Sequence, residues 1–188
     1  MNFEPLTTML LLAAAGVAVN IVVYPSRTAR AGISFLLFAA LAALNIPLYG
    51  AMGSVVKIPF SVMGQPISFA VTPLAFYFSL MITGITLLTV IFSFPSPDGE
   101  GKAKGYYLWL FVKTFGMLGV IFAYDFLTFF LLWELMTWGT FFLMQQSGGA
   151  STAPARKYIV YAVASSMLIF LQRGDPGLQT GKESRTLC

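Results

Sequence analysis

Hydrophobic residues occur in long runs along this chain, and polar residues gather in short segments between them. A helix needs about 20 apolar residues to cross the hydrocarbon core of a bilayer, which is about 30 Å thick. Most of the runs reach or approach that length. The pattern therefore predicts an all-α membrane protein with about six transmembrane helices, at residues 6–24, 31–49, 73–94, 106–124, 126–144 and 155–171.

Three of these spans depart from a simple apolar run. The second contains Asn45 and Pro47, and proline loosens a last turn because it lacks the N–H that a helix uses. The sixth is apolar only over 158–171, which is short for an untilted crossing. The first, at 6–24, is preceded by Glu4 and by no Lys or Arg. A cleaved signal peptide needs a positively charged start, so it is the weaker alternative there.

The segments outside the spans carry predictions of their own. Residues 55–70 alternate β-branched and aromatic residues around a Met-Gly-Gln-Pro sequence, which predicts a short β-hairpin at the membrane surface. Asp125 marks a very tight turn, so the fourth and fifth spans form an antiparallel pair, and Gly116 and Gly119 predict close helix packing in the fourth. The polar segment 172–188 lacks periodicity and is predicted to be a disordered tail.

Composition and charge agree with a membrane protein. Hydrophobic residues make up 57% of the chain, charged residues 10%, and the mean hydropathy is +0.80. The net charge of +4 comes from basic residues scattered between apolar runs, so the sequence predicts no nucleic-acid partner. Among the predicted connections, Lys57 is the only basic residue in the even-numbered ones. By the positive-inside rule the odd-numbered connections are cytoplasmic, which predicts a multi-pass protein of the cell (inner) membrane with both termini outside. The basic residues of those connections are Arg27, Arg30, Lys102, Lys104, Arg156 and Lys157.

Several kinds of chemistry are excluded by residue usage. The chain has no histidine, so the proton carriers left are Glu, Asp, Lys, Tyr and ordered water. Its one cysteine, Cys188, is the last residue and has no internal disulfide partner. No phosphate loop, metal cluster or nucleotide fingerprint occurs in the sequence, so no cofactor or metal site is predicted.

The fifth span contains a single carboxylate, Glu134, close to its middle. An ionised group at that depth costs roughly 3 kcal/mol on insertion scales, and a helix that keeps one usually uses it for ion or proton transfer. The sequence favours that function for Glu134. The alternative is a carboxyl group made harmless by protonation or by a neighbouring cation.

A cation, Lys113, lies in the fourth span. Counted from the turn at Asp125, Lys113 is twelve residues deep and Glu134 nine, which is an offset of about 4.5 Å along the helices. Two interpretations stand side by side: Lys113 pairs with Glu134 in a proton-responsive couple, or its long side chain extends to the cytoplasmic interface. Thr137 and Trp138 follow Glu134 on the same helix face, where hydroxyl and indole groups are able to order water.

The sixth segment carries a polar stripe at helical spacing, formed by Tyr158, Tyr161 and Ser165. We take Tyr161 as a candidate proton-transfer residue, together with Glu134, Lys113 and Thr137, because such a stripe inside a bundle is able to form a hydrated path. Hydroxyl groups also mediate packing between membrane helices, and packing is the favoured interpretation for Ser165 and Ser166.

The residues of 70–171 resemble a known family. The run YYLWLFVKTFGMLGVIFAYDFLTFFLLWELMTWGTFFLM, followed by ARKYIVYAVASSMLIFL, is similar to the antiporter-like membrane subunits shared by respiratory complex I, multisubunit cation/proton antiporters and membrane-bound hydrogenases. In that family a tight turn with an Asp-Leu-Leu-like sequence leads into a helix with a Trp-Glu pair, here Trp133 and Glu134. The basic-aromatic opening of the next helix, here Arg156, Lys157 and Tyr158, is also alike.

The resemblance implies that Glu134 is a proton-channel carboxylate whose charge is modulated by a lysine on a later helix. It also implies a proton-translocating subunit of an NADH–quinone oxidoreductase-type complex, or of a related hydrogenase or antiporter, without redox cofactors of its own. Its partners would be lipid, other membrane subunits, and protons or Na⁺. Where the family often opens its third helix with an Asp and a Ser, this chain has Thr72, Pro73, Leu74 and Ala75, and Lys113 has no clear family counterpart. The alternative is a structural or assembly subunit with a static Glu134–Lys113 pair and no transport of its own.

The resemblance ends near Leu171, and the family's subunits have many more helices than are predicted here. We therefore expect a truncated fragment that transports no ions when expressed alone, with 172–188 as an out-of-frame or otherwise foreign extension. A naturally short subunit that completes its channel with another chain is the alternative.

Overall fold

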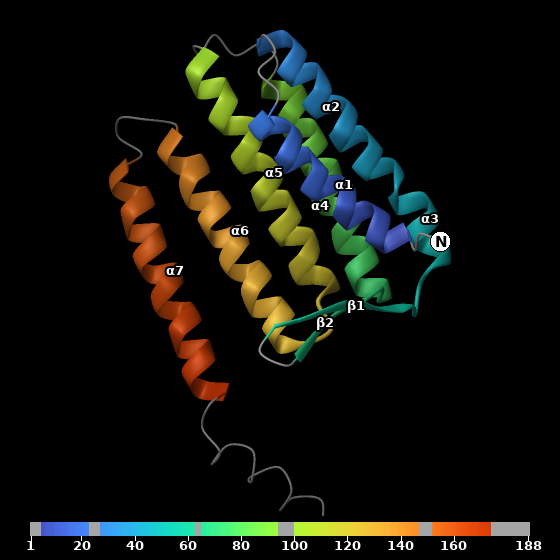
Figure 1. Ribbon diagram of the computed structural model, residues 1–188. Coiled ribbons are helices and arrows are strands. Elements are labelled where there is room, and N and C mark those ends of the chain that lie inside the picture. The colour runs from blue at the N-terminus through green and yellow to red at the C-terminus, as the bar shows by residue number, and fades with distance from the viewer. Residues whose placement is uncertain (1–4, 23–26, 63–64, 94–99, 147–151, 174–188) are drawn as a thin grey trace, which may run out of the picture.

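The structure, a computed structural model, describes residues 5–22, 27–62, 65–93, 100–146 and 152–173. Helices run side by side through most of this part of the chain, and one β-hairpin lies across an end of the bundle (Figure 1). The predicted all-α membrane fold with a surface hairpin is confirmed. In chain order the elements are α1 (Pro5–Val22), α2 (Arg27–Ala43), α3 (Asn45–Gly50), β1 (Val55–Val62), β2 (Gln65–Ala70), α4 (Pro73–Ser93), α5 (Glu100–Phe122), α6 (Phe126–Gln146) and α7 (Thr152–Arg173).

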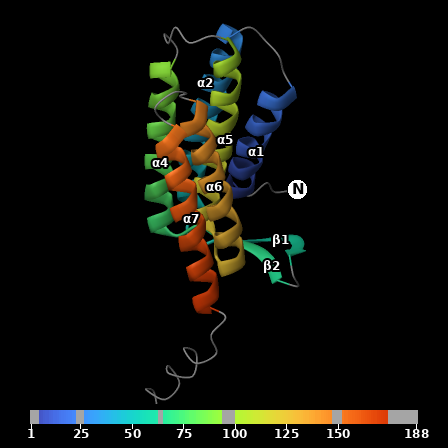
Figure 2. The ribbon, with the colours of Figure 1, turned by 90° about the vertical axis from the view of Figure 1, so that its left-hand side faces the viewer.

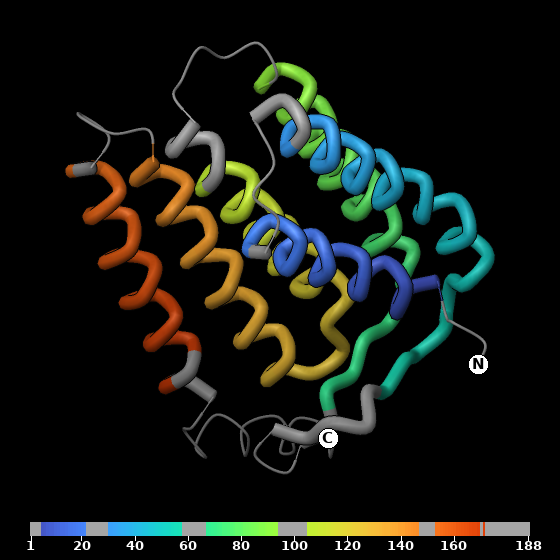
Figure 3. The backbone as a smooth tube through the Cα atoms, turned by 45° about the horizontal axis from the view of Figure 1, so that its top comes forward, coloured from blue at the N-terminus to red at the C-terminus, as the bar shows by residue number. Residues whose placement is uncertain are grey.

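The bundle is built around α5, which packs against α1, α2, α4 and α6. Beyond α5 the layers continue with α6 and then α7, and α7 packs against α6 at the edge of the bundle (Figures 1 and 2). The tube in Figure 3 shows α5, α6 and α7 following one another in a row, with α1 on the opposite side of α5. Helix α6 is therefore covered by helices on two sides, whereas α7 is covered on one.

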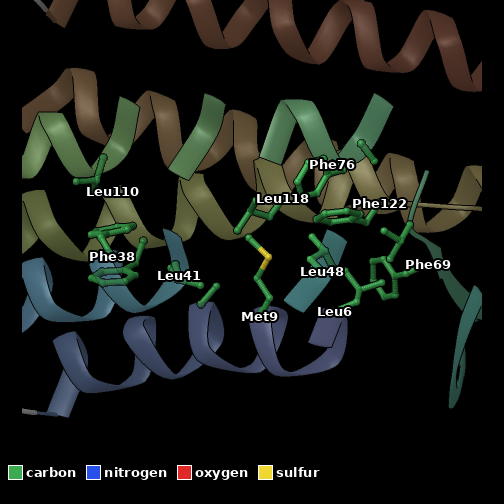
Figure 4. Packing of buried hydrophobic residues seen from close by; sticks show 14 of the residues in the cluster. Leu6, Met9, Phe38, Leu41, Leu48, Phe69, Phe76, Leu110, Leu118 and Phe122 are labelled. Atoms are coloured by element: carbon green, nitrogen blue, oxygen red, sulfur yellow. The ribbon is translucent and has the colours of Figure 1, made fainter. Parts of the chain in front are cut away.

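The hydrophobic core lies between α1, α2, α3, α4 and α5. The rings of Phe38 and Phe111 stack with their centroids 4.1 Å apart. A Cβ atom added at Gly16 would lie 2.4 Å from the Phe111 ring, so α1 approaches α5 closely only because residue 16 has no side chain. Farther along the same interface, Met9 and Leu118 extend toward each other (Figure 4). Both are completely buried, as are Phe38 and Phe111.

The second apolar run is broken where the sequence predicts it. Helix α2 ends at Ala43, and α3 begins at Asn45. The Asn45 amide donates to the carbonyl oxygens of Ala42 (3.0 Å) and Leu41 (3.3 Å) and to the Thr83 hydroxyl of α4 (3.1 Å). The Ser79 hydroxyl donates to the Asn45 side-chain oxygen. Every polar atom of the Asn45 side chain is thus satisfied, and the network ties α3 to α4 inside the bundle.

The predicted hairpin at 55–70 is present, with β1 and β2 antiparallel from the Val55–Ala70 pair to the Val62–Gln65 pair. The other edge of β2 meets the turn between α5 and α6, through a bridge between Phe69 and Ala123. The hairpin is therefore attached to the end of the α5–α6 pair.

Four stretches of the described chain are long and apolar enough to cross a membrane, and α1 is a shorter apolar helix. Helix α7 contains Arg156 and Lys157 near its start and is outside that set. The remaining predicted tail, 174–188, lies outside the described residues, while 172 and 173 belong to α7. Large apolar side chains are exposed on α4, which suits a lipid or protein environment and not water. They include Leu74, Tyr77, Phe78, Met81, Ile85, Leu88, Ile91 and Phe92. The four candidate spans are Arg30–Gly50, Pro73–Ser93, Gly105–Phe122 and Phe126–Gln146.

Candidate functional site

Helix α6 carries the candidate carboxylate Glu134, and its start is fixed by Asp125. The Asp125 carboxylate accepts hydrogen bonds from the backbone N–H (2.8 Å) and the hydroxyl (2.6 Å) of Thr128, which caps the helix. It also accepts the backbone N–H of Ser68 on β2 (3.0 Å). Burial opposes ionisation of Asp125, but these hydrogen bonds outweigh it and lower the pKa of the carboxyl group below its usual value. The sequence indicated a turn at Asp125 but not this double role.

Helices α5 and α6 approach each other through glycines. A Cβ atom added at Gly116 would lie 2.7 Å from the Met136 backbone nitrogen, and one at Gly119 would lie 2.5 Å from the Leu132 side chain. The close packing predicted from this glycine pair is confirmed. Gly139 of α6 makes the reciprocal approach, since a Cβ atom added there would lie 2.9 Å from the Lys113 backbone nitrogen. Sequence reasoning missed Gly139, although a glycine inside an aromatic membrane helix is a signal of close packing.

These contacts fix the direction in which Glu134 points. With about 100° between successive residues of an α-helix, Glu134 lies about 170° around α6 from the mean direction of Leu132, Met136 and Gly139. Glu134 is therefore on the side of α6 opposite α5. Its Oε1 atom is buried and has no hydrogen-bond partner among the residues that the structure describes.

Lys113 belongs to α5, and it faces a different side of α6 from the side that carries Glu134. Its backbone is opposite Gly139, five residues or about 7.5 Å of rise beyond Glu134, instead of the predicted 4.5 Å. The count from Asp125 assumed that the last residue of α5 lies beside the first residue of α6. The glycine contacts instead place the end of α5 beside the second turn of α6. The described part of the chain contains no ion pair between Lys113 and Glu134. The static pair considered from the sequence is therefore not formed, because the two side chains belong to different faces.

Thr137 is the hydroxyl residue closest to Glu134 along α6. It is buried, and its hydroxyl donates to the Trp133 carbonyl oxygen at 2.9 Å, so its own oxygen keeps acceptor capacity. Trp138 is half-exposed and joins an aromatic group with Phe141 and Phe142, with ring centroids 6.0 and 6.1 Å away. Packing of rings accounts for Trp138 without a polar role.

The hydroxyl residues of α7 named from the sequence lie in different environments. Tyr161 is 71% exposed, so in the described structure it faces away from the bundle. Ser165 is exposed as well, and its hydroxyl donates to the Tyr161 carbonyl oxygen (2.8 Å). Ser166 is buried, and its hydroxyl donates to the Ala162 carbonyl oxygen (3.0 Å). Of these α7 hydroxyl groups, the one that enters the helix interface belongs to Ser166.

The described residues contain no group of three or more His, Cys, Asp or Glu side chains arranged to hold a metal ion. Within the described residues, Glu134 is a carboxyl group in the middle of a membrane-length helix, with the Thr137 hydroxyl one turn away. Such a group is suited to proton exchange.

Comparison with known proteins places the chain among related sequences and folds. Over 96 residues it is 29% identical to the Na(+)/H(+) antiporter subunit A1 of Staphylococcus haemolyticus (strain JCSC1435). Its fold matches a chain of the Mrp complex from Dietzia sp. DQ12-45-1b, with a TM-score of 0.76 and 26% identity over 89% of this chain. In sequence and in fold the chain resembles the antiporter-like membrane subunits. A chain of the archaeal membrane-bound sulfane sulfur reductase, a respiratory membrane complex, shares the fold with a TM-score of 0.78 and 24% identity over 95% of this chain.

The chain spans only part of the length of its relatives. The matched region is 51% of this chain but 11% of the antiporter subunit A1, and the structural matches cover 19% and 28% of the chains compared. No family model matches the sequence. The related chains are parts of membrane complexes, and together with the apolar helices of the described residues they identify this chain as a multi-pass membrane protein.

Proposed function

We propose that this chain is a proton-translocating subunit of an NADH–quinone oxidoreductase-type complex, or of a related hydrogenase or cation/proton antiporter, and that Glu134 carries the proton. The observation that supports this most is the buried, unpartnered Oε1 atom of Glu134. It lies in the middle of α6, one of the stretches long enough to cross a membrane. Protons are the favoured ion, and Na⁺ is the ion exchanged with them in an antiporter.

The position of Glu134 on its helix supports the proposal. A buried carboxylate that serves structure is normally held by a cation or by several hydrogen bonds, because leaving it unpaired is costly. Glu134 faces away from α5 and from Lys113, so no ion pair has to break before it takes up or releases a proton. A proton would reach Glu134 from the side of α6 that faces away from α5.

The other proposed proton-transfer residues have unequal parts. Thr137, one turn from Glu134 and buried, would help to order water beside the carboxyl group. Lys113 and Tyr161 lie on other faces, one at the α5–α6 contact and the other on the exposed side of α7. We expect their replacement to affect transport less than replacement of Glu134.

The test is proton flux into liposomes that contain the chain together with the membrane subunits that co-purify with it. Glu134→Gln keeps the size of the side chain and removes the exchangeable proton, so we expect it to abolish flux while the complex still assembles. Glu100→Gln, the same change at the first residue of α5 and outside the candidate spans, is the matched control and should leave flux unchanged.

Unchanged flux in Glu134→Gln would overturn the proposal. Failed assembly in that variant would instead support the structural or assembly role. Repeating the assay with a Na⁺ gradient in place of the pH gradient distinguishes Na⁺-coupled exchange from proton movement alone.

We also propose that the described hairpin faces the outside, as the positive-inside rule predicts from the sequence. In a Cys188→Ser background, a cysteine at Ser61 of β1 should react with an impermeant reagent added outside, while cysteines at Ser26 and Ser147 should react only from the cytoplasmic side. Labelling of position 61 from the cytoplasm would reverse the proposed orientation.

A further inference from the structure

We propose that Asp125 is a positioning residue, which joins the β-hairpin to the first turn of α6 and thereby fixes where that helix holds Glu134. The importance of Glu134 rests on the proposed function, but the link between Asp125 and the place of Glu134 does not.

A main-chain bridge and a side-chain hydrogen bond attach β2 to the turn between α5 and α6. The bridge joins Phe69 and Ala123 and includes the hydrogen bond from the Tyr124 backbone N–H to the Ser68 carbonyl oxygen, at 2.9 Å. It ends before α6 begins at Phe126. The side-chain bond runs from the Ser68 N–H to the Asp125 carboxylate, at 3.0 Å.

Of these groups, the Asp125 side chain is the one that contacts both β2 and the first turn of α6. One carboxylate oxygen accepts the Thr128 N–H at 2.8 Å, and the other accepts the Ser68 N–H and the Thr128 hydroxyl. A single side chain thus holds the hairpin and an unpaired amide of the first helical turn at the same time. Displacement of the hairpin would therefore move the start of α6 with it.

Contacts near both of its ends fix the position of the first half of α6. Asp125 holds the start, and farther along α6 Leu132 packs on Gly119 of α5 and the Met136 backbone packs on Gly116. Glu134 lies between Asp125 and Met136, nine residues or about 13.5 Å of rise from Asp125. If the Asp125 contact is lost, the first turns of α6 are able to tilt about the glycine contact, and Glu134 changes its surroundings.

The experiment uses the full chain in lipid bilayers with three variants. Asp125→Ala removes both links, and Asp125→Asn keeps one oxygen that caps the helix but places an NH₂ group, which cannot accept, opposite the Ser68 N–H. Thr128→Val removes only the hydroxyl donor and serves as the matched control. The measurements are hydrogen exchange of the Ser68 amide and the infrared carbonyl band of the protonated Glu134 carboxyl group, assigned by its loss in Glu134→Gln.

We expect the Ser68 amide to exchange about tenfold faster in Asp125→Ala and Asp125→Asn, which corresponds to one lost hydrogen bond. The Glu134 band should shift in both variants and stay in place in Thr128→Val. If Asp125→Ala does not fold, Asp125→Asn decides the result. A band that stays at its original frequency in Asp125→Asn would overturn the proposal, as would a Ser68 amide that exchanges no faster.

The infrared measurement needs no transport, so it fails or succeeds independently of the proposed function. A shifted band together with unchanged flux in Glu134→Gln would sustain the positioning role of Asp125 and overturn proton transport by Glu134. An unshifted band together with lost flux in Glu134→Gln would do the reverse.

Discussion

Asn45 and Glu134 are both polar residues within apolar stretches long enough to span a membrane, and the structure treats them in opposite ways. Asn45 is buried with all of its side-chain hydrogen-bonding groups engaged, by its own helix and by Ser79 and Thr83 of α4. Glu134 has a buried oxygen with no partner in the described residues. A satisfied network holds helices in place, whereas an unsatisfied group costs stability and is kept for another purpose. The difference separates the Asn45 network, which joins α3 to α4, from Glu134 on α6.

The strongest test of this division concerns the α5–α6 contact, in which glycines bring the two helices close together. Gly139→Val would place a side chain where Lys113 backbone atoms lie 2.9–3.0 Å away, so we expect a loss of about 3 kcal/mol in unfolding free energy. Gly84→Val on α4 is the matched control, since nothing lies within 4 Å of its added Cβ. Thermal unfolding in detergent measures both. Equal stability of the two variants would show that the glycine contact is not what holds α6.

A smaller effect is expected in the polar network. Asn45→Ala removes the hydrogen bonds to Thr83 and Ser79, and interhelical hydrogen bonds in membrane proteins contribute about 1 kcal/mol. Asn20→Ala is the control, because the Asn20 amide bonds only within its own helix and its Oδ1 has no partner in the described structure. Asn45→Ala should unfold at a lower temperature than Asn20→Ala, with unchanged proton flux per assembled complex.

Glu134→Gln completes this comparison, because it breaks no hydrogen bond or ion pair of Oε1 in the described residues, and it should unfold no earlier than the unchanged protein. An earlier transition in this variant than in Asn45→Ala would reverse the assignment of the structural and the functional polar group.

Much of the fold was predictable from the sequence, since membrane helices depend on run length and on breakers that are visible in one dimension. The break at Asn45, the hairpin at 55–70 and the tight turn at Asp125 belong to this class. The position of Lys113 relative to Glu134 could not be predicted in this way. Whether two residues meet depends on which faces α5 and α6 turn to each other and on how far one helix slides along the other. Gly116 and Gly139 set both quantities through contacts between distant parts of the chain.

The candidate site was predictable as a residue but not as an arrangement. Glu134 stands out because a carboxylate is rare in so apolar a run. The dual contacts of Asp125 were hidden, because Ser68 is far away in the sequence and contributes a backbone amide, which leaves no mark on residue identity. Tyr161 shared a stripe with Ser165, but a stripe does not tell which side of α7 the neighbouring helix covers.

The two kinds of glycine contact imply different rules for sequence variation among relatives. Gly16 lies against the ring of Phe111, so a larger residue at 16 becomes acceptable wherever position 111 is small, and the two positions should change together. Gly139 lies against the backbone of residue 113, which is present whatever the side chain is. Position 139 should therefore stay glycine or another very small residue in relatives with this helix pair, while position 113 varies freely between charged and apolar residues.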